Sequence, residues 1–180
     1  MEDFRQSYNI ETYLFDTVGP TFIQQGYLEA CDFFCIVIWK ANRAKSRIAK
    51  RLRSVEHENL DVAVQALTAS IHQQRTAKER LRVLWEWAFY LLMASAILTV
   101  LCPNEFTMYD IRVCEALGDF HELKSISNFD KLWVRYEMFI RSVEAATPQN
   151  LSLQDKDKSL LGKLFFEQLS QQITLNFRKL

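Results

Sequence analysis

Apolar residues recur at steps of three and four along most of this chain, and that period predicts α-helices rather than strands. The clearest case is an amphipathic helix with apolar residues at Leu60, Val64, Leu67 and Ile71. A Thr76-x-x-Glu79 pair follows it. This spacing is typical of a capping box, in which two side chains bond the free amides of a first helical turn. A new helix is therefore expected to begin there.

Two further helices are predicted in the last third of the chain. Asn128 precedes the first of them, and Ser152 precedes the second. The apolar positions of the second are Leu160, Leu161, Leu164, Phe165, Leu169 and Ile173. Aromatic residues such as Phe165, Phe166 and Phe177 exceed what one small core needs to bury. An excess of this kind predicts a surface that contacts another protein.

The first third of the chain contains two predicted interruptions and one long apolar run. Gly19-Pro20 and Gly26 are expected to break the helical pattern. The aromatic and β-branched residues of 33–39 would also suit a buried strand. We favour a helix, because the run continues without a break into the helical pattern of 40–52 and no partner strand is evident.

The central stretch, Met93–Leu117, predicts two helices joined by a proline-marked turn. Pro103 has no amide hydrogen and disfavours helix in the preceding residue, so the first helix should end near residue 101 or 102. The second helix is expected to start with Thr107 as its N-cap and Asp110 as the carboxylate of a capping box. Gly118 is a plausible stop signal at its end.

The composition agrees with an all-α fold. The 180 residues include four Gly and three Pro, well below the average usage of about 7% and 5%. Such scarcity favours long helices with short connections over a fold with many tight turns. A hydrophobic content of 49% is ample for a core. We therefore predict one domain over 1–180, with possible lobes formed by 1–75 plus 145–180 and by 76–144.

A formal net charge of zero means that any nucleic-acid contact must come from a local patch. The one basic cluster lies in 40–53, and its candidate contact residues are Lys40, Arg43, Arg47, Lys50 and Arg51. On a continuous helix most of these would share one face and could neutralise phosphates. The alternatives are an acidic protein partner, pairing with acidic residues of the same chain such as Glu56, Glu58 and Asp61, or a merely solvated face.

The four cysteines, Cys31, Cys35, Cys102 and Cys114, lie in apolar runs without C-x-x-C spacing. We interpret them as reduced core residues of a cytoplasmic protein and expect no metal site. No signal peptide is visible at the first residues. The most apolar stretch, 88–102, is about 15 residues long, shorter than the ~20 that a membrane-spanning helix needs. We therefore expect no membrane contact.

Residues 103–113 read Pro-x-x-Phe-Thr-x-Tyr-Asp-x-Arg-Val after a helix of small residues. This segment resembles the surroundings of the catalytic aspartate in helix-hairpin-helix DNA glycosylases, the superfamily that contains 8-oxoguanine DNA glycosylase. Asp110 is the matching position. The resemblance implies that Asp110 stabilises positive charge on the sugar as the base leaves, with Arg112 holding that carboxylate or a phosphate.

The chain departs from this family at two places. The glycine-rich hairpin turn that grips a DNA phosphate has no counterpart in 85–93, which contains no glycine. The lysine that bifunctional members use for a Schiff base is missing from 91–101. The whole chain also resembles bacterial 8-oxoguanine-glycosylase-like proteins of antiphage signalling operons, through residues 36–52 and 151–169 together with the central stretch.

Two functions remain open at this point. The first is a degenerate glycosylase-fold protein that acts as an interaction module in bacterial antiphage defence and binds a partner protein or nucleic acid. The second is a monofunctional N-glycosylase, without lyase activity, that removes a modified base with Asp110 as the catalytic carboxylate. Neither implies a cofactor. The missing glycines and lysine favour the first.

Overall fold

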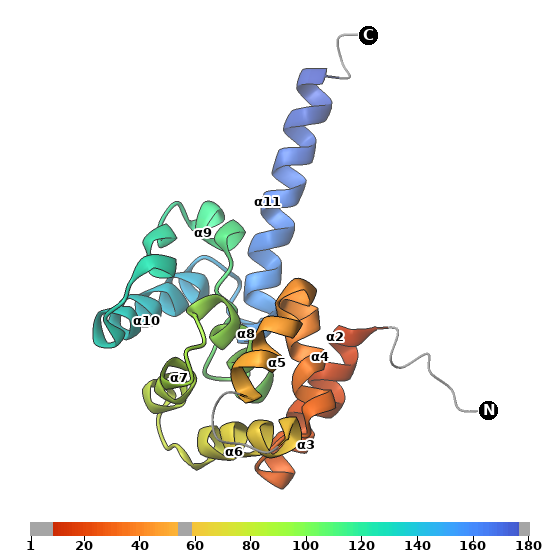
Figure 1. The fold of residues 1–180 in the computed structure, drawn as a ribbon. Helices are drawn as coiled ribbons and strands as arrows, with labels where there is room; N and C mark the ends of the chain where they lie inside the picture. The colour runs from red at the N-terminus through yellow and green to blue at the C-terminus, as the bar shows by residue number, and fades with distance from the viewer. Residues whose placement is uncertain (1–8, 54–58, 177–180) are drawn as a thin grey trace, which may run out of the picture.

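Helices make up all of the regular structure in the part of the chain that the computed structural model describes, residues 9–53 and 59–176 (Figure 1). The all-α prediction is confirmed. In chain order the elements are α2 (Ile10–Tyr13), the π-helical turn η1 (Leu14–Val18), α3 (Gly19–Gln25), α4 (Ala30–Ala41), the 3-10 turn η2 (Asn42–Ala44), α5 (Lys45–Arg53), α6 (Leu60–Gln73), α7 (Ala77–Glu86), α8 (Leu91–Leu101), α9 (Ile111–Leu117), the 3-10 turn η3 (His121–Ser125), α10 (Phe129–Ala145) and α11 (Leu153–Asn176).

The first helical stretch does not break at Gly19-Pro20, so that prediction is wrong. The chain stays helical from Ile10 to Gln25. A π-helical turn ends just before the proline, and Pro20 occupies one of the first positions of α3, where a missing amide hydrogen is tolerated. Gly26 does end the helix, in the left-handed conformation with φ of 80°.

Gly19 is needed for packing rather than for a turn. A Cβ atom on this residue would lie 2.8 Å from the backbone oxygen of Val100 in α8. No real side chain tolerates so short a distance to backbone, so glycine is what lets α3 approach α8 this closely.

The apolar run 33–39 is helical, as predicted, but it does not continue into one helix through residue 52. Ala41 has φ of −162°, and the 3-10 turn η2 separates α4 from α5. The break lets α4 bury Phe33 and Ile36 while α5 turns Ile48 and Leu52 inward. The predicted single helix would have placed most basic residues of 40–53 on one face, and the break between α4 and α5 removes that arrangement.

Helix α8 is the centre of the fold. All of its residues from Ala94 to Leu101 are buried, and it packs against α3, α4 and α7. The helix ends at Leu101, as Pro103 predicts. Thr76 and Glu79 form the predicted capping box at the start of α7. Four residues, 87–90, connect α7 to α8, and Ala88 adopts φ of 58°, a left-handed conformation that usually favours glycine.

Three buried hydrogen bonds hold the segment between α8 and α9 in place. The Tyr109 amide donates to Ser95 Oγ at 2.9 Å, and its hydroxyl donates to the Phe120 carbonyl oxygen at 3.0 Å. Tyr136 of α10 donates its hydroxyl to the Thr107 carbonyl oxygen at 2.6 Å. Because these bonds are buried, the segment enters α9 at a defined position and direction.

Helix α10 begins after Asn128, and the Ser152 hydroxyl accepts from the Asp155 amide at the start of α11, as the sequence predicts. The first half of α11 packs against α9 and α10, whereas its second half projects beyond the other helices (Figure 1). We call residues 164–176 the arm. No helix among the described residues is long and apolar enough to cross a membrane. The division into two lobes stays a prediction.

Candidate functional site

Asp110 is itself the N-cap of α9, so the prediction that Thr107 fills this role is wrong. Its Oδ1 accepts from the Arg112 amide at 3.0 Å, and the helix begins at Ile111. Thr107 is instead fully buried, and its hydroxyl oxygen has no hydrogen-bond partner in the structure. The bond between Ser95 and the Tyr109 amide explains the difference, because the Ser95 hydroxyl accepts from an amide that a Thr107 N-cap would need as its donor.

Two cations hold the Asp110 carboxylate. Lys40 Nζ of α4 lies 3.2 Å from Oδ2 and also donates to the Tyr109 carbonyl oxygen at 3.3 Å. Arg112 Nε lies 3.3 Å from Oδ1. The Lys40 and Asp110 side chains are only 10% and 17% exposed, whereas Arg112 is 67% exposed. The inner pair therefore connects α4 to the start of α9, and Arg112 covers it from outside.

Asp110 is ionised in this setting. Burial opposes its charge, but the hydrogen bond from the Arg112 amide and the positive charge of Lys40 outweigh burial and lower its pKa. This carboxylate therefore has the charge state that the glycosylase resemblance implies. Both of its oxygens are also already engaged by donors of the same chain.

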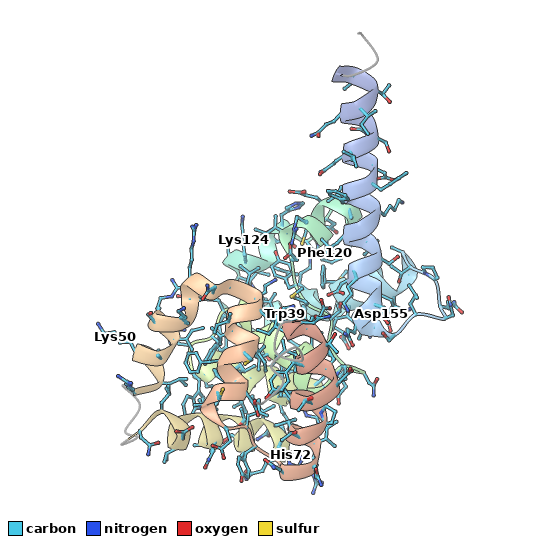
Figure 2. The ribbon with its side chains drawn as sticks, turned by 90° about the vertical axis from the view of Figure 1, so that its right-hand side faces the viewer. Trp39, Lys50, His72, Phe120, Lys124 and Asp155 are labelled. Carbon is cyan, nitrogen blue, oxygen red and sulfur yellow. The ribbon has the colours of Figure 1, made fainter. Side chains whose placement is uncertain are left out.

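A cavity of about 250 Å³ opens beside this pair. We call it the Asp110 cavity. It is lined by Glu11, Phe15, Trp39, Lys40, Thr99, Met108, Asp110, Arg112, Gln154, Asp157, Lys158 and Leu161. Figure 2 shows Trp39 beside the start of α11, where Asp155 lies. The cavity therefore lies where α2, α4, the entry to α9 and α11 meet.

Asp157 is a functional candidate that the sequence analysis missed. The residue is 3% exposed, and burial raises the pKa of its carboxyl to about 7, although backbone hydrogen bonds and the charge of Lys158 act in the opposite direction. Asp157 stands in the alternating charges of 155–158, which are typical of an exposed helical turn. Its helical position could have identified it as buried, because Asp157 lies on the same side as Leu153, Leu160 and Leu164.

Aromatic rings form one wall of the cavity. The Phe15 and Trp39 rings meet edge to face with centroids 5.8 Å apart. Lys158 Nζ lies 5.5 Å from the centre of the Phe15 ring and 2.5 Å from the carboxylate of Glu11. The cavity thus combines flat apolar surface, fixed cations and two carboxyl groups whose pKa values are shifted in opposite directions, an arrangement typical of acid–base sites.

A second cavity, of about 370 Å³, lies on the other side of Asp110. Lys40, Arg47 and Arg51 line it together with mostly apolar residues. Arg51 Nη1 donates to the Ala88 carbonyl oxygen, and the guanidinium lies 6.0 Å from the ring centres of Phe89 and Tyr90. Arg51 is therefore attached to the turn between α7 and α8.

The remaining predicted basic contacts, Arg43 and Lys50, are exposed and line neither of these two cavities. Figure 2 shows Lys50 at the edge of the molecule, away from Trp39. The five basic residues thus do not form the predicted single helical stripe, because η2 separates Lys40 from α5. Of the acidic residues considered as partners, Glu56 and Glu58 lie outside the described residues, and Asp61 accepts from the Ala30 amide at 3.1 Å.

The cysteines are only partly core residues. All four are free thiols, but Cys31 is exposed, Cys35 and Cys102 are half-buried, and only Cys114 is fully buried. The prediction of a core position is wrong for Cys31, because this residue lies in the first turn of α4 on the side away from Phe33. Within residues 9–53 and 59–176, no group of three or more His, Cys, Asp or Glu is placed to hold a metal ion.

Comparison with known proteins returns no family model, no curated protein and no solved structure that matches this chain. The class that fold and site define is an all-α protein with a charged, partly aromatic cavity at the start of α9.

Proposed function

We propose that this chain is a binding module that keeps a helix-hairpin-helix glycosylase-like scaffold without its chemistry and acts through a protein partner in bacterial antiphage defence. The arm of α11 is the observation that carries this proposal. Phe165 and Phe166 are 67% and 69% exposed, and Leu169, Ile173 and Leu175 are exposed further along the same helix. Large apolar side chains gathered on a projecting helix are typical of a surface that another protein covers.

The state of Asp110 supports a binding role over a catalytic one. A carboxylate stabilises positive charge on a substrate most strongly when no fixed cation of the protein already neutralises it. Both oxygens of Asp110 accept bonds from Lys40 or Arg112, and the carboxylate also caps α9. Its contacts account for a structural role, in which it ties α4 to α9. The antiphage setting comes from the sequence resemblance, and the cytoplasmic location from the pattern of the cysteines.

The second candidate is an N-glycosylase that removes a modified base from nucleic acid without lyase activity, and the Asp110 cavity favours it. Here Asp110 would stabilise positive charge on the sugar, and Phe15 and Trp39 offer rings on which a base could stack. Asp157, protonated below pH 7, could donate a proton to the departing base. Exposed Arg43, Arg47 and Lys50 would contact phosphates.

One set of variants separates the two functions. Purified chain and Asp110→Asn are incubated with oligonucleotides that carry modified bases, and released base is measured. Asparagine is as good an N-cap as aspartate, so this variant keeps α9 intact. The binding module predicts no release from either protein. Base release by the unmodified chain that Asp110→Asn abolishes would overturn the proposal in favour of the glycosylase.

Phage plating on cells that express the chain's defence operon tests the binding role directly. We expect Phe166→Glu with Leu169→Glu to abolish protection and Asp110→Asn to leave it unchanged. The reverse pattern contradicts the proposal.

Nucleic-acid contact is tested by substituting Arg43 and Arg47 with Glu and measuring oligonucleotide affinity at two salt concentrations. An unchanged affinity removes the nucleic-acid partner.

A further inference from the structure

We propose that two copies of this chain pair through their arms, which lie antiparallel to each other and bury one apolar face of each copy. This inference rests on the proposed function as a binding module and specifies the partner as a second copy of the same chain.

Four of the five exposed large apolar residues of the arm, all except Leu175, have the spacing of a helix-pairing seam. Gly162, Phe166, Leu169 and Ile173 follow one another at steps of four, three and four, and Phe165 flanks them. We call these five residues the seam. Steps of this kind keep the side chains on one face along two heptads, as in paired helices. All five residues are exposed.

The seam is a separate face from the side of α11 that packs on the other helices. The packed side contains Asp157, Leu160 and Leu164, all of them buried or half-buried. With 100° between successive helical residues, the mean direction of the seam lies nearly half a turn, about 160°, away from that side. Contact with α9 and α10 therefore leaves the seam uncovered.

Charge favours a second copy over a partner recognised by charge. Residues 164–176 contain one charged side chain, Glu167, and it pairs with Lys163 at 3.9 Å. Neither residue belongs to the seam. Two identical arms therefore meet without like-charge repulsion across their contact, and the arm offers no charge pattern that would select a different partner.

Shape favours the antiparallel orientation. The heptad steps then place Gly162 opposite Ile173 of the partner subunit, and Phe166 opposite Leu169 of the partner subunit. No atom lies within 4 Å of the position that a Cβ on Gly162 would occupy, so a large side chain finds room there. A parallel pair would instead place glycine opposite glycine and leave a gap, which well-packed interfaces avoid.

The area is sufficient for a weak dimer. Phe165 and Phe166 are about two thirds exposed and Leu169 and Ile173 about two fifths. Two seams together therefore bury at most roughly 800–900 Å² of side-chain surface, just under the ~1,000 Å² expected of a stable specific interface. We therefore expect reversible association that depends on protein concentration rather than an obligate dimer.

Sedimentation analysis of the full chain over a wide concentration range tests the pairing. We expect the mass to rise with concentration from 21.2 kDa to twice that value. Phe166→Glu with Leu169→Glu should stay monomeric throughout. Gln171→Glu with Thr174→Glu adds the same charge on the opposite, exposed face and should still dimerise. An unmodified chain that stays at the monomer mass, or equal disruption by both variants, overturns the proposal.

Cross-linking tests the orientation. In a Cys31→Ser background, chains with Phe166→Cys and chains with Leu169→Cys carry tags of different size and are mixed and oxidised. The antiparallel pair predicts mainly disulfides between the two kinds of chain, and the background alone should form none. Disulfides mainly between identical chains would show parallel arms and contradict the proposed orientation.

The two proposals fail in different ways. If the unmodified chain is monomeric but the seam variant still loses phage protection, the second copy is excluded and the binding module stands with another partner. If the seam variant loses the dimer but keeps protection, the pairing stands and the proposed function fails.

Discussion

The two halves of α11 both carry apolar residues at helical spacing but lie in different surroundings. In the first half Asp157 and Leu160 are buried against the rest of the molecule, although Asp157 carries a carboxyl group. In the second half Phe165 and Phe166 are among the most exposed apolar side chains of the described residues. The comparison teaches that an apolar position in a helical pattern predicts the helix but does not predict what covers that position.

The largest expected difference between the halves is in their contribution to folding stability. Leu160→Ala should lower the free energy of unfolding by about 2–5 kcal/mol, because it leaves a cavity in a packed site. Leu169→Ala should change it by less than ~0.5 kcal/mol in the monomer, because the residue is exposed. Urea unfolding at a concentration where the chain is monomeric measures both. Equal losses would show that the arm packs on the other helices in solution.

The buried half should also make stability depend on pH. The pKa of Asp157 is raised to about 7 in the folded chain, from the ordinary aspartate value of 3.8. The folded state therefore holds a proton that the unfolded state releases, and stability falls as pH rises from 4 through 7.

Asp157→Asn removes this ionisation while keeping the shape of the side chain. We expect the variant to gain a few kcal/mol of stability relative to the unmodified chain between pH 5 and pH 8. Glu167→Gln, which removes one carboxyl from the exposed half, is the matched control and should follow the unmodified chain. Thermal unfolding at the two pH values compares them, and parallel curves for Asp157→Asn would contradict a buried, neutral carboxyl.

The smallest expected effect concerns the junction on which the first half of α11 packs. Asp110→Ala removes the N-cap of α9 and leaves Lys40 without its carboxylate, so we expect a loss of about 1–2 kcal/mol. Arg112→Ala removes only an exposed cation and should cost less than ~0.5 kcal/mol. Chemical unfolding of both variants measures the difference. A larger loss for Arg112→Ala would show that the outer ion pair, rather than the inner one, holds α9.

Local signals predicted most of the helix ends. The capping box of Thr76 and Glu79 and the left-handed Gly26 and Gly118 lie where the sequence indicates. These signals succeed because each concerns residues within one turn of each other. Pro20 misled the prediction, because a π-helical turn just before it accommodates a residue without an amide hydrogen.

Only some of the contacts in the candidate site could be predicted from the sequence. Asp110 and Arg112 are two residues apart, so their contact is local and could be inferred. Lys40, which bonds Asp110, lies 70 residues away in the chain, and Asp157 of α11 lines the same cavity as Asp110. Neither contact could be inferred from local sequence. The pattern of the basic cluster suggested a stripe on one helix, and the break at Ala41 separated Lys40 from the residues that follow it.

The sequence by itself determined that the chain forms helices and where most of them begin and end, because helical period, caps and glycine stops act over a few residues. Only the tertiary structure decided which side chains meet: that Ser95 moves the N-cap from Thr107 to Asp110, that a carboxyl of α11 is buried, and that the arm is left uncovered. The physical reason is that burial and charge pairing depend on distances in space, which a linear pattern does not contain.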